Sequence, residues 1–198
     1  MDPENRPRVT IHMAASLDGF IARKDGSVDW METADDFEDG EELGPDFVEE
    51  FHRQVDAFVM GSKTYETARG FERQGFGWPY RDKSVYVFTS RPLEKHRTSV
   101  ECVGGVLRQV LDEVVKPKHR NIWVVGGREL VNECLKSGVA DEICVAVLPI
   151  AIGEGIPFFG PLPHDVALHL TGVKAYKNGM VELKYEVRRP ERGRDVSG

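Results

Sequence analysis

Five short segments of this chain are almost continuously apolar, and they constrain its fold more than any other feature. Strict alternation of apolar and polar residues would indicate strands with one face in water, whereas continuous apolar runs of this length indicate strands buried on both faces. Such strands occupy the middle of a largely parallel sheet that helices cover. The segments are Val9–Ala15, Ala57–Met60, Ser84–Thr89, Asn121–Val125 and Glu142–Leu148.

Helical patterns lie between these runs. Apolar residues recur at helical spacing over Val106–Val115, with charged residues on the opposite face. A second pattern over Leu130–Leu135 is ended by Gly138, a third is expected at about Asp46–Gln54, and another helix is expected to begin after Gly61. Strands that alternate with helices in this way predict an α/β fold.

The C-terminal part has a different pattern. Val181–Val187 alternates between apolar and charged residues, as a half-exposed strand does, and Leu168–Lys177 is expected to be its partner. Asn178-Gly179, the preferred two-residue hairpin turn, connects them. We therefore expect a three-layer α/β/α sandwich whose mixed, mostly parallel sheet ends in an antiparallel hairpin. It is expected to form one domain over residues 8–188, with flexible ends at 1–7 and 189–198.

Composition excludes several classes of function. The chain has 198 residues, 40% of them hydrophobic and 30% charged, as in an ordinary globular protein. Its net charge of -7 argues against a general binder of nucleic acids or anionic membranes. The longest apolar run, Ile143–Ile152, contains Pro149 and is shorter than the roughly 20 residues that a spanning helix needs. We expect neither a nucleic-acid partner nor membrane insertion, and the first seven residues do not resemble a secretory signal.

The three cysteines, Cys102, Cys134 and Cys144, are too few for a disulfide framework and lie within apolar patterns. We expect them to be small buried side chains, as in a protein of the reducing cytoplasm. None of the six histidines lies at metal-ligand spacing beside them, so the sequence predicts no metal site.

Four stretches follow predicted strands, where α/β sheets collect ligands. In Ala14–Ala22, small residues leave room for a flat ligand, although a plain turn at Asp18-Gly19 explains this stretch more simply. In Met60–Thr67, a helix start with Lys63 and Thr64 suits a phosphate, and a simple helix cap explains it equally. A P-loop is excluded there, because the earlier glycine of that motif is replaced by Asp56.

The other two stretches also suit phosphates. In Phe88–Pro92, two hydroxyls and Arg91 suit a phosphate monoester, although alone a solvated turn is the simpler explanation. In Val124–Leu130, two glycines at a helix start let a pyrophosphate approach the backbone; a tight turn is the weaker alternative, and the G-x-G-x-x-G pattern is absent. Two helix starts suited to anions and one Ser-Arg strand end together suit a ligand with separated phosphates. A dinucleotide with an additional phosphate monoester, NADP, fits that count.

In this order and spacing, the stretches resemble the dihydrofolate reductase-like superfamily. The resemblance is closest to the reductase domain that forms the C-terminal half of the bifunctional deaminase-reductase of riboflavin biosynthesis, and it covers about Val9 to Val187. It implies an NADPH-dependent reductase that is usually a homodimer. The motifs are Ser16–Gly19, Met60–Thr64, Thr89–Arg91, Val125–Gly127 and Leu148–Phe159.

The resemblance also implies a role for individual residues. The nicotinamide side is expected at Ala14, Ile21, Ala22 and Trp30, and the pyrophosphate at Gly61, Ser62, Lys63 and Thr64. The adenosine 2′-phosphate is expected at Thr89, Ser90 and Arg91, and a second phosphate turn at Gly126, Gly127, Arg128, Glu129 and Leu130. Substrate contacts are expected at Asp18, Glu49, His52 and Arg53.

The chain departs from the riboflavin reductases where they bind substrate. Tyr65 follows Thr64 where those enzymes have an Asp-Asp-Pro segment, and Val125 replaces a substrate-contacting glutamate. His52 and Arg53 lie near the position of a phosphate-binding arginine. The folate reductases, in turn, have an arginine at the position of Ser62. The resemblance therefore implies a different or broader substrate.

The proton donor is not assigned by spacing. Counting back from Thr64 leads to Pro45 or Asp46, whereas counting forward from Trp30 leads to Asp35, because about ten additional residues intervene. We choose Asp46, with Glu49 one turn further on; a solvated acidic loop is the alternative. Trp78 and Tyr80 are expected either to line the substrate cleft or to pack a loop.

The sequence thus predicts a cytoplasmic enzyme that uses NADPH to transfer a hydride to a small heteroaromatic or imine substrate. It is expected to be related to 5-amino-6-(5-phosphoribosylamino)uracil reductase of riboflavin biosynthesis. The alternatives are a pterin or dihydrofolate-type reductase and a non-catalytic NADP-binding sensor.

Overall fold

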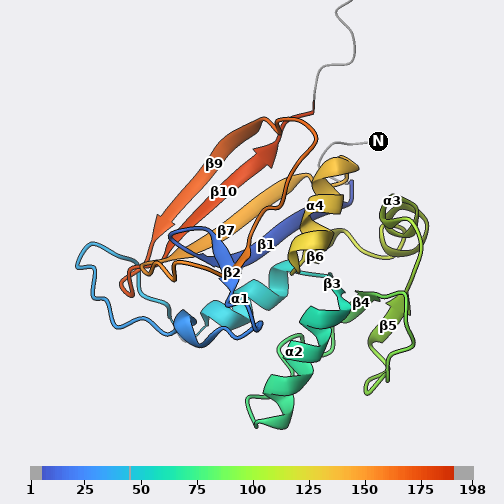
Figure 1. Ribbon diagram of the computed structural model, residues 1–198, viewed down its shortest axis with the longest axis horizontal. Helices are drawn as coiled ribbons and strands as arrows, with labels where there is room; N and C mark the ends of the chain where they lie inside the picture. The colour runs from blue at the N-terminus through green and yellow to red at the C-terminus, as the bar shows by residue number, and fades with distance from the viewer. Residues whose placement is uncertain (1–5, 45, 190–198) are drawn as a thin grey trace, which may run out of the picture.

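The computed structural model describes residues 6–44 and 46–189, and a mixed sheet forms its middle layer (Figure 1). The strands of this sheet are β1 (Arg8–Ser16), β3 (Ala57–Gly61), β4 (Ser84–Phe88), β5 (Val100–Val103), β6 (Asn121–Val124), β7 (Glu142–Leu148), β9 (Leu168–Ala175) and β10 (Val181–Val187). Their spatial order is β5-β4-β3-β6-β1-β7-β10-β9. Neighbours from β5 to β7 are parallel, whereas β10 is antiparallel to both β7 and β9.

Helices cover the two faces of the sheet. Side chains of α1 (Phe47–Gln54) and α2 (Ser62–Arg73) pack on one face, around Phe58 and Met60 of β3. On the other face lie α3 (Leu107–Val110), a π-helical turn η3 (Leu111–Val115) and α4 (Arg128–Lys136), which pack around Ala57 and Val59. Successive residues of β3 point to opposite faces, so this strand is buried from both sides. The expected three-layer α/β/α architecture is confirmed.

Three small elements lie beyond the carboxyl ends of β1 and β7. The strand β2 (Phe20–Ala22) pairs with β8 (Ile156–Pro157) in a separate two-stranded sheet, and a single 3-10 turn, η2 (Asp29–Met31), follows. The pairing of β2 with β8 places the segment after β7 beside the segment after β1. The two segments are therefore neighbours although they are far apart in the sequence.

The predicted strands are present with ends that differ by one or two residues. The expected helix over Val106–Val115 is α3 continued by the π-helical turn η3. The edge strand β5 was not predicted, because its four residues include the exposed Glu101 and do not form a continuous apolar run. At an edge, pairing with β4 alone is enough to hold a strand that has weak apolar character.

The acidic segment after η2 is attached to the C-terminal hairpin. Phe37 N donates to Lys177 O at 2.7 Å, Glu41 N donates to Ala175 O at 2.8 Å, and Lys177 N donates to Glu41 O at 3.0 Å. Gly40 lies so close to the backbone of Tyr176 and Lys177 that a Cβ would collide with it. The side chains of this segment are largely exposed, as expected for a solvated loop, but its backbone is tied to β9.

The predicted flexible ends fall mainly on residues 1–5 and 190–198, which lie outside the described residues. The single-domain boundary of 8–188 stays a prediction. Within residues 6–44 and 46–189, none of the helices combines the length and the apolar character that crossing a bilayer requires.

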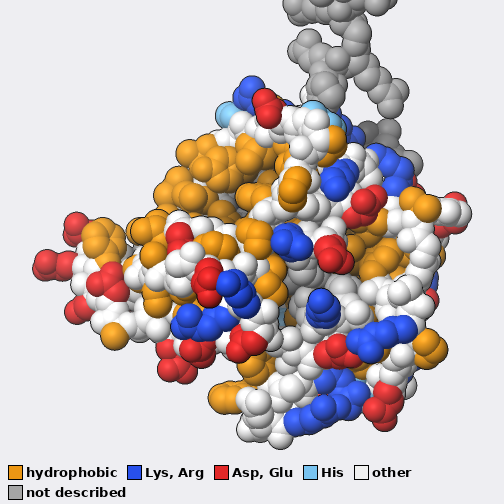
Figure 2. All heavy atoms as spheres, viewed as in Figure 1, with side chains coloured by type: hydrophobic (Ala, Val, Ile, Leu, Met, Phe, Trp, Pro, Cys, Tyr) orange, Lys and Arg blue, Asp and Glu red, His pale blue; other side chains and the backbone are white. Residues whose placement is uncertain are grey.

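Part of one sheet face has no helix over it. Side chains of directly paired residues point to the same face of a sheet. Leu170 of β9 pairs with Tyr185, which pairs with the core residue Ile143 on the α4 side. Val173 pairs with Leu183, two residues before Tyr185, so Leu170 and Val173 both point to the α4 side of the sheet. Leu170 is 49% exposed and Val173 is 56% exposed. In Figure 2, orange side chains gather over β9 and β10 at the upper left. Leu168 of β9 also lines a cavity of about 570 Å³, together with Phe159 and Leu162.

Candidate active site

The predicted ligand-binding stretches lie along one edge of the sheet. Because β1, β3, β4 and β6 are parallel, the turns that follow them emerge at the same carboxyl edge. Their order across the sheet is Thr89–Arg91 after β4, Gly61–Thr64 after β3, Gly126–Leu130 after β6 and Ala14–Ala22 at the end of β1. Stretches that are scattered in the sequence are therefore brought into one line.

The two glycine-rich helix starts are in direct contact. Gly61 N donates a hydrogen bond to Gly126 O at 2.9 Å, and Thr64 Oγ1 lies beside both Gly126 and Gly127. Gly126 has a φ of +109° and follows β6 so closely beside Met13 that a Cβ would lie 2.7 Å from the sulfur. The Gly126–Gly127 peptide bond is cis. Only glycine fits at position 126 without displacing the side chain of β1.

Both helices begin without a side-chain cap. The N-cap of α2 is Gly61 and that of α4 is Gly127, and neither helix start has a side-chain hydrogen bond. The first N–H groups of a helix have no partner within the helix and carry partial positive charge. The basic side chains of Lys63 and Arg128 stand at these helix starts and form no ion pair with another described residue. The starts of α2 and α4 are therefore two adjacent sites that suit an anion.

The predicted monoester site forms a tight turn. Arg91 N donates to Thr89 Oγ1 at 3.1 Å, and Thr89 Oγ1 donates to Arg91 O at 2.8 Å. Ser90 is exposed between them. The guanidinium of Arg91 forms an ion pair with Glu66 of α2, with 2.6 Å between Nη2 and Oε1. The turn is therefore ordered, and its arginine is held over the first part of α2.

A second glycine pair, which sequence reasoning missed, lies beside this turn. Thr89 N donates to Val103 O at 3.0 Å, and a Cβ on Gly104 would lie 3.2 Å from Thr89 O. Val103-Gly104-Gly105 leads from a strand into a helix, as Val125-Gly126-Gly127 does. This repeated Val-Gly-Gly pattern is the signal that would have identified it.

The residues expected around the nicotinamide come from three successive elements: Ala14 from β1, Ile21 and Ala22 from β2, and Trp30 from η2. Ala14 and Ile21 are half-buried, whereas Ala22 and Trp30 are buried. The indole nitrogen of Trp30 is buried and has no hydrogen-bond partner within the described part of the chain. The partly exposed, apolar side chains of Ala14 and Ile21 suit contact with a flat ring.

Asp18, which is expected to contact substrate, connects two loops. Its carboxylate accepts hydrogen bonds from the Ser16 hydroxyl at 2.6 Å, from Gly153 N at 2.7 Å and from Ile152 N at 3.2 Å. The Ser16 hydroxyl, followed by the two backbone amides, holds the pKa of this carboxyl below its usual value. Asp18 therefore fixes the loop after β7 against the turn between β1 and β2.

The expected proton donor and three of the expected substrate residues, at the start of α1 and within it, differ in exposure and partners. Asp46, the expected proton donor, immediately precedes α1 and is exposed, as is Arg53. Glu49 forms an ion pair with Arg81 at 2.6 Å. His52 is buried against Phe58, and burial lowers its pKa. After the hydrogen bond from Arg81, the charges of Arg53 and His52 also lower the pKa of the Glu49 carboxyl, so these three side chains lie near one another.

Trp78 and Tyr80, which are expected either to line the substrate cleft or to pack a loop, lie in the core on the α2 side of the sheet. Trp78 lies edge-on to Tyr65, with 6.1 Å between ring centroids, and 5.1 Å from the ring of Tyr80. Tyr80 in turn lies 4.8 Å from Phe58, and burial raises the pKa of its hydroxyl. Of the two expectations, these contacts favour loop packing.

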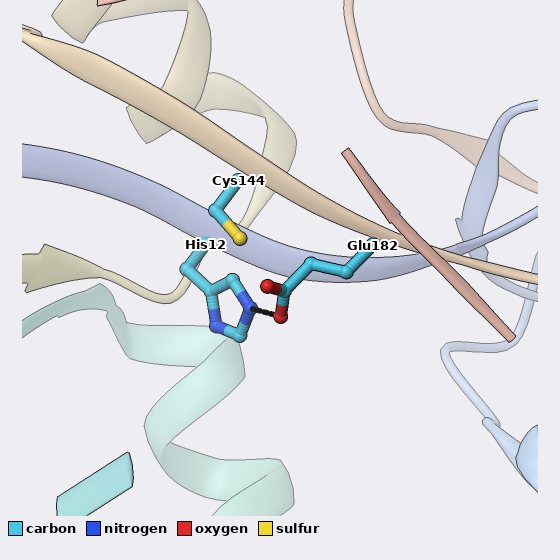
Figure 3. Close-up of side chains that lie close together, drawn as sticks. All are labelled: His12, Cys144 and Glu182. Atoms are coloured by element: carbon cyan, nitrogen blue, oxygen red, sulfur yellow. Dashed lines mark ion pairs between the residues drawn. The ribbon is translucent and has the colours of Figure 1, made fainter. Parts of the chain in front are cut away.

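A cluster of polar side chains lies on the α1 side of the sheet, close to Ala14. His12 of β1 points toward Cys144 of β7 and Glu182 of β10, as Figure 3 shows. Burial, assisted by the charge of Lys184, lowers the pKa of His12 to about 4, and burial raises the pKa of Cys144 to about 12. Sequence reasoning missed this cluster because its members come from three distant strands and have no common spacing.

Comparison with known proteins identifies the family. Residues 7–182 match the model of the RibD C-terminal domain. The uncharacterized protein YwjB of Bacillus subtilis (strain 168) is 36% identical over 178 residues, which cover 90% of this chain and 97% of YwjB. Among solved structures, a protein of Shewanella sp. PV-4 whose name relates it to riboflavin biosynthesis has a TM-score of 0.75 and 25% identity, covering 92% of this chain and 99% of that one.

A dihydrofolate reductase shares the fold more distantly. The enzyme of Enterococcus faecalis, solved in complex with NADP(H), has a TM-score of 0.59 and 18% identity, covering 92% of this chain and 97% of that one. The resemblance to the dihydrofolate reductase-like superfamily is thereby confirmed for the fold. The chain belongs to the RibD C-terminal domain family.

Proposed function

We propose that this protein is a cytoplasmic reductase that uses NADPH to transfer a hydride to a small heteroaromatic or imine substrate. The order of the turns along the sheet edge supports this most strongly. Reading from β4 to β1, the turns suit a phosphate monoester, then two adjacent phosphates, then a flat ring. This is the order of the 2′-phosphate, the pyrophosphate and the nicotinamide in NADP. Three steps between strands span roughly 14 Å, which suits an extended dinucleotide.

The residues present fit this cofactor. The uncapped starts of α2 and α4 would hold the pyrophosphate through backbone N–H groups, with Lys63 and Arg128 adding positive charge. Arg91 would bind the 2′-phosphate. When bound, NADPH supplies the hydride, and the protein's part is to orient the ring and exclude water. Trp30 and Ala22, both buried, would form the wall that excludes water on the nicotinamide side.

The substrate is proposed to resemble that of the riboflavin reductases without being identical to it. Val125 is half-buried beside the glycine turn and offers no side-chain hydrogen bond where those enzymes use a glutamate. Asp46 stays the proposed proton donor, since it precedes α1 and, unlike Glu49, is not held by Arg81. A pterin or dihydrofolate-type substrate is the second candidate.

Cofactor binding is tested by titrating the protein with NADPH and with NADH while energy transfer from tryptophan to nicotinamide is followed. Preferential binding of NADPH is expected, and binding of neither nucleotide would overturn the proposal. Oxidation of NADPH with pterins and ribosylaminopyrimidines then tests for turnover. Asp46→Asn should reduce turnover and leave NADPH binding unchanged, with Asp39→Asn as the control in the neighbouring acidic segment. NADPH binding without turnover of these substrates would favour the sensor.

The homodimer is proposed to use the uncovered face of β9 and β10. Leu168, Leu170 and Val173 form an exposed apolar row there, next to Phe159. A second copy of the chain, presenting the same row, would remove both rows from water, as in an interface of two-fold symmetry. The face lies on the opposite side of the sheet from α1, so dimerisation would leave the proposed substrate side open.

A further inference from the structure

Three polar side chains from adjacent strands converge on the α1 side of the sheet (Figure 3). His12 pairs directly with Cys144 across β1 and β7, and Glu182 follows on β10, which is the other neighbour of β7. One ring nitrogen of His12, the Cys144 sulfur and one carboxylate oxygen of Glu182 all lie within 4.8 Å of one another. Their backbones are fixed by the sheet ladder, which makes the arrangement a rigid one.

One of these three donor atoms lacks a hydrogen-bond partner. His12 Nε2 is buried, and within residues 6–44 and 46–189 it has no hydrogen-bond partner. The Glu182 oxygen lies 4.0 Å away, beyond hydrogen-bond distance. A buried polar atom without a partner is unfavourable, and a cation placed between nitrogen and oxygen would interact with both.

We propose that His12, Cys144 and Glu182 bind a single divalent transition-metal ion, for which Zn²⁺ is the best match. Imidazole nitrogen, thiolate sulfur and carboxylate oxygen are the protein ligands of Zn²⁺. With metal–ligand bonds of about 2.0–2.3 Å in a tetrahedral site, neighbouring donor atoms lie roughly 3.3–3.8 Å apart. The three donors therefore need to approach one another by about 1 Å. Three protein ligands leave one position for water or another ligand.

The surroundings orient the histidine and limit the affinity. The His12 ring lies edge-on to Trp123, with 4.4 Å between centroids, and 5.6 Å from the ring of Phe51. Lys184 follows Glu182 by two residues on the same face of β10, and its ammonium forms an ion pair with Glu142 at 3.6 Å. Its positive charge opposes a bound cation, so replacing it should strengthen metal binding.

The test is a Co²⁺ titration of the full chain after dialysis against a chelator. Tetrahedral Co²⁺ with a thiolate ligand gives a sulfur-to-cobalt charge-transfer band, and we expect this band to saturate at about one ion per chain and to disappear when Zn²⁺ displaces Co²⁺. Cys144→Ser should abolish the band, and His12→Gln and Glu182→Gln should weaken Co²⁺ binding by at least about 10-fold. Lys184→Gln should bind Co²⁺ more tightly than the unmodified chain.

Two matched variants serve as controls. Cys102→Ser removes a half-buried cysteine of β5, and Glu186→Gln removes an exposed carboxylate of β10. Neither should change the band. Absence of a charge-transfer band in the unmodified, folded chain would overturn the proposal, as would loss of the band in Cys102→Ser but not in Cys144→Ser. The strengthening by Lys184→Gln keeps the test decisive if a ligand variant does not fold.

Discussion

Arg91 Nη2 lies 2.6 Å from Glu66 Oε1, so the side chain proposed to recognise the 2′-phosphate is held by a carboxylate of α2. Both side chains are about half exposed, with 59% and 47% of their surfaces accessible. An ion pair of this exposure contributes only about 0–1 kcal/mol. A phosphate with two charges can therefore compete for the guanidinium at small cost.

Replacing Arg91 should change the affinity for NADPH but not the affinity for NADH. Arg91→Ala should weaken NADPH binding by about 1.5–3 kcal/mol, because charge-assisted hydrogen bonds to the 2′-phosphate are lost. NADH lacks this phosphate, so its affinity should be unchanged. Isothermal titration with each nucleotide measures both affinities, and an equal loss for both would show that Arg91 does not recognise the 2′-phosphate.

Replacing its partner should have the opposite effect. Glu66→Gln removes a negative charge near the expected phosphate and releases Arg91, so NADPH should bind about two- to five-fold more tightly. The control is Glu50→Gln, which changes an exposed carboxylate of α1. Weaker NADPH binding in Glu66→Gln would mean instead that the carboxylate positions the arginine for the phosphate.

The stability of the loop after β7 should depend on pH through Asp18. Its pKa is lowered in the folded protein by the Ser16 hydroxyl and the amides of Gly153 and Ile152. The resulting stabilisation is fully present above the unfolded value of about 4 and is lost as pH falls through the folded pKa. Asp18→Asn should therefore lower Tm at pH 7, and the difference from the unmodified chain should shrink towards pH 3. A Tm difference that is the same at pH 7 and at pH 3 would contradict this role.

The proposed dimer should be disrupted by charge on the uncovered face. Val173→Glu places a carboxylate in the middle of the apolar row of β9, where burial of an unpaired charge is unfavourable. Light scattering after size-exclusion chromatography should show a dimer for the unmodified chain and a monomer for the variant. His169→Glu, on the same strand but paired with Glu186 on the opposite face of the sheet, is the control and should stay dimeric. A monomeric unmodified chain would exclude this interface.

Much of the fold was predictable because buried strands have a recognisable apolar pattern in the sequence. Strands covered on both faces, such as β3 and β7, are almost continuously apolar. The Asn178-Gly179 turn joins two strands that are adjacent in the chain. The edge strand β5 and the two-residue strand β8 leave no such mark. Their positions depend on partners that the local sequence does not specify.

In the candidate site, too, some features follow from the local sequence and others only from the tertiary structure. Turns that join a strand to a helix, such as those at Gly61 and Gly126, are determined by local sequence, because tight turns and close backbone approach require glycine. Only the tertiary structure placed these two turns in contact and paired Arg91 with Glu66. It also brought His12, Cys144 and Glu182 together. Such contacts follow from strand order and register, and sheet pairing joins residues whatever their separation along the chain.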